Sequence, residues 1–349
     1  MREVYGIDPA SGLARVPWDN VGVQYGLRAV ATGQLTPEEF LDLNARIGSW
    51  KEPEEAVPES CALASAIGGE ELGLLASVIG MCEGDDPDWW SARQMEFSSD
   101  AAQPAPRRTA DVEAIEAAYE QGLVFSGHLP REVPIIDARH YLEEQLDMHN
   151  AHQSFAVRER IRRAQGDIDN HAIWFLDARP EEDEQATSRL FERGFRVMDR
   201  WIRKIERHPT GDVGESRPRQ ADDSCWHTDG RRIARGEDVW SGATQLIESG
   251  LGAWTVEAPG DVDGVPVGEC AAAFPLHSTS RIVAGGPVTG DVYKCRTEPV
   301  EQAIAGGHYG QWTPTPEQRA QLEGIFPEGV CDYSVPGVGQ PGRLVERPG

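Results

Sequence analysis

Apolar residues recur at helical spacing in four stretches of the chain and form short continuous runs in two others. The helical spacing predicts helices over about residues 36–47, 112–121, 151–164 and 187–208, and the runs at 133–137 and 171–176 predict buried strands. The first helix begins with a capping-box pattern, in which Thr36 and Glu39 flank a proline at the first helical position. The last helix has the longest apolar stripe, which we expect to be buried: Leu190, Phe191, Phe195, Met198, Trp201, Ile202 and Ile205.

The order helix, strand, helix, strand, helix over residues 110–208 predicts an α/β fold with a parallel sheet. Residues 210–349 are rich in Gly and Pro, with short strand-like runs at 254–256 and 281–283, and they predict an irregular extension. We therefore expect three regions: a helical, lid-like region at 1–108 with a buried helix pair between Cys61 and Cys82, part of a sheet domain at 109–209, and the extension at 210–349.

Charge and motif content exclude several classes of partner. The 349-residue chain carries a formal net charge of −25, which argues against binding to nucleic acid or to anionic lipid. It contains no apolar run long enough to predict a membrane span. It also contains no phosphate-binding loop and no dinucleotide fingerprint, so we expect no nucleotide or other cofactor.

Six cysteines are present, and none of them forms a C-x-x-C pair, so zinc-site spacing is absent. The last four lie in the Gly- and Pro-rich region, where disulfides would supply stability that a weak core lacks. We predict that Cys225 pairs with Cys270 and Cys295 with Cys331, since each pair brackets a loop-rich stretch. Disulfides imply an oxidising compartment, yet residues 1–4 do not begin a signal peptide, so we expect the natural N-terminus to lie upstream.

The residues after the first predicted strand, 137–152, are dense in ionisable groups. Because ligands of α/β sheets bind beyond the carboxyl ends of the strands, this loop is a candidate site. Asp147 precedes a helix, where it is either a charge favourable to the helix dipole or the acid of a Ser-His-acid triad. Asp147, His149 and His152 also have spacing that a metal ion can use, but histidines in polar loops are more often solvated, so no metal is predicted.

Several motifs resemble a family of mostly secreted bacterial proteins that is classed as a domain of unknown function. They are PWDNVGVQYGL at 17–27, FLDLNARIG at 40–48, VPIID at 133–137, DMH at 147–149, CW at 225–226, HS at 277–278, VAG at 283–285, KC at 294–295 and FPEGVCDYSVPGVG at 326–339. The last of these is also similar to the tail of the tannase and feruloyl-esterase family. The resemblance covers nearly the whole chain, with a looser fit over 51–108.

The resemblance implies an α/β-hydrolase of roughly twice this length, with a serine-bearing, Gly-rich turn upstream. No G-x-S-x-G occurs in the present sequence, so the chain resembles the C-terminal part of such an enzyme, with the nucleophile half missing. In the esterase relatives a disulfide braces the loop of the catalytic histidine, and His277 lies close to Cys270. His277 is therefore the preferred catalytic histidine and His149 the second candidate, with an ordinary structural role as the alternative for either.

Two hypotheses follow. The first is the acid and histidine part of a secreted or periplasmic serine ester hydrolase, with Asp147 behind the histidine, a small-molecule ester as substrate and the missing N-terminal half as partner. The second is a non-catalytic remnant or a secreted binding module whose exposed tryptophans hold a ligand.

Overall fold

The computed structural model describes residues 1–56, 94–129, 133–143, 150–177, 184–207, 212–250 and 260–341. Two compact units are present, and the chain passes from the first into the second and back again. Unit 1 is formed by residues 1–121 and 292–340, and unit 2 by residues 122–291 and 341–349. The region boundaries near 108 and 209 remain predictions, as does the helix pair between Cys61 and Cys82, which lies outside the described residues.

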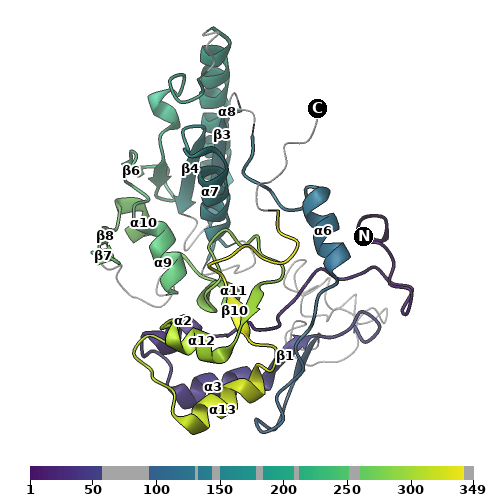
Figure 1. Cartoon of the computed structure of the whole chain (residues 1–349). Helices are drawn as coiled ribbons and strands as arrows, with labels where there is room; N and C mark the ends of the chain where they lie inside the picture. Colours follow the sequence, from purple (N-terminus) through teal and green to yellow (C-terminus); the bar gives the residue numbers. More distant parts are fainter. Residues whose placement is uncertain are drawn as a thin grey trace, which may run out of the picture. The chain divides into compact units, whose positions relative to one another are not determined.

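The regular structure described in unit 1 consists of short helices and two two-stranded sheets. Its elements are α1 (Arg2–Tyr5), α2 (Leu27–Ala31), α3 (Pro37–Arg46), β1 (Ile47–Trp50), β2 (Met95–Phe97), α6 (Val112–Glu120), β9 (Arg296–Glu298), α12 (Val300–Ala305), α13 (Pro316–Ile325) and β10 (Val330–Asp332). Helices α3 and α13 lie side by side (Figure 1), and their apolar faces share a core that includes Phe40, Tyr309 and Leu322. This core therefore joins residues from the two ends of the chain.

Unit 2 contains a four-stranded sheet with strand order β3-β4-β5-β6. Its elements are β3 (Ile135–Tyr141), α7 (His152–Gln165), β4 (His171–Asp177), α8 (Glu184–Arg207), the 3-10 helix η2 (Arg219–Ala221), β5 (Ser224–Trp226), β6 (Arg232–Arg235), α9 (Ala243–Ser249), β7 (Asp261–Val262), β8 (Val265–Pro266), α10 (Glu269–Ala273) and α11 (Ser280–Val283). Strands β3, β4 and β5 are mutually parallel, whereas β6 is antiparallel to β5. The predicted α/β character is thus present, in a sheet that is mixed and that includes two strands from beyond residue 209.

Alternate residues of β4 face opposite sides of this sheet, so the strand is buried on both. Ile173 and Phe175 pack in the core that includes Phe155 of α7, whereas Trp174 packs with Trp201 of α8. The near-continuous apolar run at 171–176 is what a parallel strand covered on both faces requires. Helices α7 and α8 therefore lie on opposite faces of the sheet.

Two predicted features are wrong. Phe191, Phe195 and Ile202 of α8 are 46%, 76% and 42% exposed, so only part of the predicted stripe is buried. The apolar stripe is too wide for one packing face, and the sheet takes the half that includes Leu190 and Trp201. The strand-like run at 281–283 is helical, because the hydroxyl of Thr279 caps α11 by accepting the N–H of Ile282.

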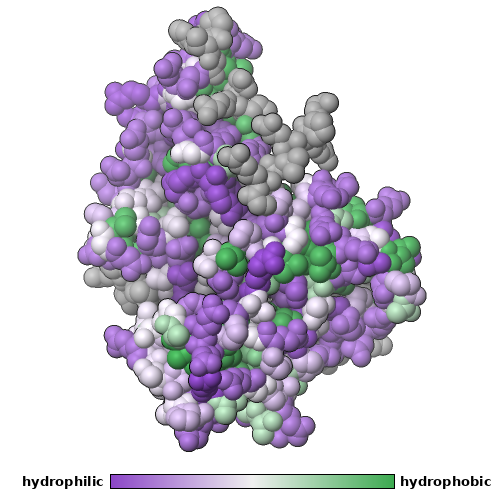
Figure 2. Space-filling view, viewed as in Figure 1, coloured by the Kyte–Doolittle hydropathy of each residue, from purple (hydrophilic) through white to green (hydrophobic). Residues whose placement is uncertain are grey.

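Both predicted disulfides are present. Cys225 pairs with Cys270 in unit 2, and Cys295 pairs with Cys331 in unit 1, with Cα separations of 5.8 and 5.4 Å. They indicate an oxidising environment. The surface seen in Figure 2 is largely hydrophilic with separate hydrophobic patches, in keeping with the high net charge. Among the described residues, no helix has the length and apolar character that a membrane span requires.

Candidate active site

The carboxyl end of strand β3 lies further along the chain than the apolar run predicted. The strand continues through Asp137 and Arg139 to Tyr141. These two charged side chains are two residues apart and so share a face of the strand, with Arg139 Nε 3.5 Å from Asp137 Oδ1. Strand β3 pairs with β4 as far as Tyr141, so the chain leaves the sheet just before Glu143.

Glu143 occupies a buried position beyond this strand end, with its side chain only 1% exposed. One carboxylate oxygen accepts the backbone N–H of Ala151, the residue that precedes helix α7. A helix N-terminus favours negative charge, so this contact stabilises Glu143 as a carboxylate. The other oxygen lies 3.5 Å from Nδ1 of His277.

His277 lies in the short loop between α10 and α11, and its side chain is 31% exposed. Because Nδ1 faces the carboxylate, Nε2 is on the far side of the ring, which is the orientation of a histidine in a Ser-His-acid triad. The 3.5 Å separation exceeds a normal hydrogen bond, and such contacts are often longer before substrate binds. The arrangement can orient an imidazole and stabilise its protonated form.

The structure describes only one of the three predicted catalytic residues. His277 is brought against a carboxylate at the end of β3, but that carboxylate belongs to Glu143. Asp147 and His149 lie outside the described residues, so their catalytic roles stay predictions. Sequence reasoning missed Glu143 because it ended the strand too early; an acidic residue placed directly after the full strand was the available signal.

Other histidines of unit 2 have different environments. Burial, with a smaller contribution from Arg139, lowers the pKa of His152 to about 4. Burial, with Arg158 and then Arg217, lowers the pKa of His171 to about 3. A histidine that takes up a proton only near these values is a poor general base at neutral pH. His277, partly exposed and next to a carboxylate, is better suited to that role.

The disulfide of unit 2 lies close along the chain to the histidine loop. It joins β5, at Cys225, to α10, at Cys270, and α10 leads directly into the loop that carries His277. Both sulfur-bearing residues are fully buried in the core that also contains Phe274. The segment before His277 is therefore anchored covalently to the sheet.

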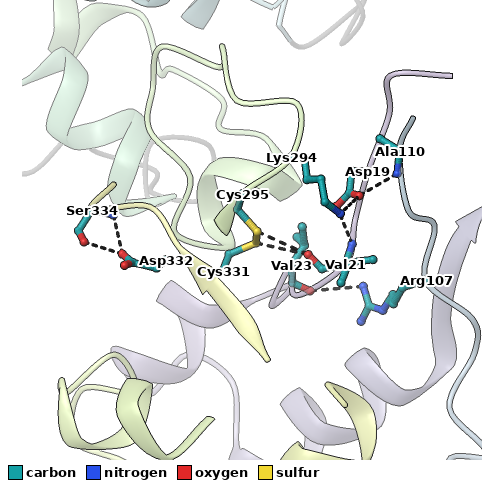
Figure 3. Close-up of a disulfide and its surroundings, with 10 residues drawn as sticks. All are labelled: Asp19, Val21, Val23, Arg107, Ala110, Lys294, Cys295, Cys331, Asp332 and Ser334. Atoms are coloured by element: carbon teal, nitrogen blue, oxygen red, sulfur yellow. Dashed lines mark hydrogen bonds and ion pairs between the residues drawn. A yellow bond between two sulfur atoms is a disulfide. The ribbon is translucent and has the colours of Figure 1, made fainter. Parts of the chain in front are cut away.

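A second cluster of motif residues surrounds the disulfide of unit 1 (Figure 3). The buried carboxylate of Asp19 accepts hydrogen bonds from the N–H groups of Val21 and Ala110, and it lies 2.6 Å from Nζ of Lys294. The sulfur atoms of Cys295 and Cys331 lie 3.5 and 3.6 Å from the carbonyl oxygen of Val21. These are contacts and not hydrogen bonds, because a disulfide sulfur carries no proton.

Close backbone packing completes this second cluster. Gly22 has a φ of +76° and its carbonyl accepts the N–H of Cys331, so a side chain there would meet Thr297 and the backbone of Cys331 at about 3 Å. The conformation and the contact both require glycine. The cluster joins the first and last segments of unit 1, and we interpret it as structural.

Metal-binding geometry is not found in the described ranges, where no group of three or more His, Cys, Asp or Glu side chains is arranged to hold an ion. His152 is described and is almost fully buried. Asp147 and His149, which would share a metal ion with it, lie outside the described residues.

The model of a tannase-like family of unknown function (DUF6351) matches residues 1–342. No curated protein and no solved structure matches the chain.

Proposed function

Because the chain belongs to this tannase-like family of unknown function, we propose that it supplies the histidine and the acid of a serine ester hydrolase. One observation supports the proposal above all: Nδ1 of His277 lies 3.5 Å from buried Glu143 at the carboxyl end of a parallel strand. Chemistry in α/β sheets is concentrated at such strand ends. In this proposal Glu143 takes the place that the sequence suggested for Asp147.

The proposed roles follow from the geometry. Glu143, held as a carboxylate at the start of α7, orients His277 through Nδ1 and stabilises its protonated form. Nε2 of His277 then accepts the proton of a serine hydroxyl as that oxygen attacks the ester carbonyl. The same proton passes to the departing alcohol, which leaves an acyl-serine; a water molecule, activated in the same way, releases the acid.

The serine is the part that this sequence does not identify, since it contains no G-x-S-x-G. We propose that the serine comes from polypeptide encoded upstream, that the longer protein is secreted, and that its substrate is a small ester. The order serine, acid, histidine along the chain would then match the order in α/β-hydrolases.

A second pair of the same kind provides a matched control. Nδ1 of His308 lies 3.3 Å from Glu298 in unit 1, and the two side chains are 34% and 10% exposed. Glu298 ends β9, which pairs antiparallel with β10, so no parallel strand end lies beside its carboxylate. A histidine–glutamate contact by itself therefore does not define a site, and the two pairs separate catalysis from ordinary ion pairing.

The test compares hydrolysis of a p-nitrophenyl ester by the chain alone and by the chain fused to the upstream polypeptide. We expect no turnover by the chain alone. In the fusion, Glu143→Gln and His277→Gln should each lower kcat by roughly 10²-fold to 10⁴-fold. Glu298→Gln and His308→Gln should leave kcat unchanged.

Three results would contradict the proposal. Turnover by the chain alone, lost on changing a residue within it, would show that the nucleophile is already present in this sequence. An active fusion that is indifferent to His277→Gln would exclude this histidine, and a fusion without any activity would favour the binding-module hypothesis.

A further inference from the structure

We infer that Tyr141 is a positioning residue that sets the separation between Glu143 and His277, an inference that rests on the proposed function. Tyr141 is the last residue of β3 and is fully buried. Its hydroxyl donates a hydrogen bond to the backbone carbonyl of Pro275. Its ring packs edge-on against Phe274, with 5.1 Å between the ring centroids.

These contacts join the two parts of the chain that carry the proposed acid and base. Glu143 follows Tyr141 by two residues, and His277 follows Pro275 by two residues. The hydrogen bond therefore joins the two segments at positions two residues before Glu143 and two residues before His277. A shift of the loop relative to the strand would change the Glu143–His277 separation directly.

The loop needs such a contact because residues 275–279 belong to no helix or strand. The loop starts after α10, which the disulfide at Cys270 anchors. It ends at Thr279, the residue that caps α11. Both constraints act on the ends of the loop. Tyr141 adds a third constraint at Pro275, two residues before His277, and it does so from the end of the strand that leads to the acid.

The chemistry of the contact explains why tyrosine suits this position. A buried phenol needs an acceptor for its O–H, and the Pro275 carbonyl supplies one. Phenylalanine would keep the ring packing against Phe274 and lose the hydrogen bond to Pro275. Because displacements of about 1 Å can lower rates by about 10²-fold, a loss of this one bond is expected to affect the pair measurably.

The test follows the titration of His277 by NMR in the intact chain with labelled histidine, a measurement that needs no nucleophile. His277→Gln identifies the signal. Glu143→Gln shows whether the carboxylate acts on the ring, and its removal is expected to lower the titration midpoint of His277. Tyr141→Phe should produce at least half of that change.

Tyr309→Phe is the matched control, since it removes a buried tyrosine hydroxyl that bonds to Gln24 at 2.6 Å in unit 1. It should leave the His277 midpoint unchanged. If Tyr141→Phe fails to fold, 3-fluorotyrosine at position 141 keeps the ring and changes the strength of the hydrogen bond, so it should still shift the midpoint.

The outcomes separate the two proposals. A midpoint that is insensitive to Glu143→Gln means that the acid–histidine pair, and with it the proposed function, is wrong. A midpoint that responds to Glu143→Gln but not to the changes at Tyr141 overturns the positioning role alone. An equal response to Tyr309→Phe would also overturn it, because the effect would then be a general loss of stability.

Discussion

At the scale of single residues, two buried histidines link the stability of unit 2 to pH. His152 and His171 are both almost fully enclosed, and burial lowers their pKa values to about 4 and about 3. In the unfolded chain both would titrate near pH 6.5. At pH values between 6.5 and the folded-state pKa of each histidine, the unfolded state binds more protons than the folded state, so acid favours unfolding.

We therefore predict that these two histidines leave the free energy of unfolding independent of pH above about pH 7. They should make it fall as the pH drops from about 6.5 towards about 4. The expected slope is about 1.4 kcal/mol per pH unit for each histidine. Denaturant unfolding at pH 7, 6 and 5 measures it. His171→Gln should reduce the slope, and an unchanged slope would show that His171 is protonated in the folded state.

At the residue scale, the catalytic role of His277 stays a prediction. The position of His277 near a cysteine pointed to the histidine that meets a buried carboxylate. The identity of that carboxylate depends on where β3 ends, and β3 pairs with β4 as far as Tyr141. Such a tertiary contact leaves no periodic signal in the sequence.

At the scale of elements, two helices of unit 1 begin in the same way. Thr36 and Thr315 are each followed by proline, and each hydroxyl accepts the N–H of the residue three positions on, Glu39 or Gln318. In turn, a side-chain oxygen of Glu39 or Gln318 accepts the backbone N–H of the capping threonine. Each box satisfies two groups that a helix start otherwise leaves to water.

We predict that Thr36→Ala and Thr315→Ala each lower the free energy of unfolding of unit 1 by about 1 kcal/mol. Thr36→Ser keeps the accepting oxygen and should have little effect. Thermal or denaturant unfolding of the three variants provides the measurement. A serine variant as unstable as the alanine variant would mean that the methyl group, and not the cap, is responsible.

Elements whose signals are local in the sequence were predicted well, and features that depend on distant contacts were not. Helix α3 was predicted because capping chemistry is local, and β4 because burial on both faces makes it uniformly apolar. The buried face of α8 was overestimated, since the width of the sheet beneath a helix is not encoded in the helix itself. The helix at Ser280–Val283 was missed because its single turn is too short for periodicity to register.

At the scale of the whole molecule, each of the two disulfides among the described residues is confined to one unit. Cys225–Cys270 closes 45 residues of unit 2, and Cys295–Cys331 closes 36 residues of unit 1. Their pairing could be predicted because each bracketed a loop-rich stretch. The division of unit 1 between the two ends of the chain could not, because it depends on contacts between distant segments.

We predict that replacing either cysteine pair by alanines destabilises its own unit by about 2–4 kcal/mol. Hydrogen exchange followed by mass spectrometry can assign the loss to a unit. Replacement of Cys225 and Cys270 should raise exchange in 122–291, and replacement of Cys295 and Cys331 should raise it in 1–121 and 292–340. A uniform rise for both variants would show that the two units unfold as one.

The divided unit also has a consequence for synthesis on the ribosome. The core of unit 1 combines Phe40 and Val30 with Val300 and Tyr309, so its first half emerges long before its second. At roughly 5–20 residues per second, translation of residues 122–291 delays completion by roughly 10–30 s. During that interval the first half exposes apolar side chains that the last part of the chain covers in the folded unit.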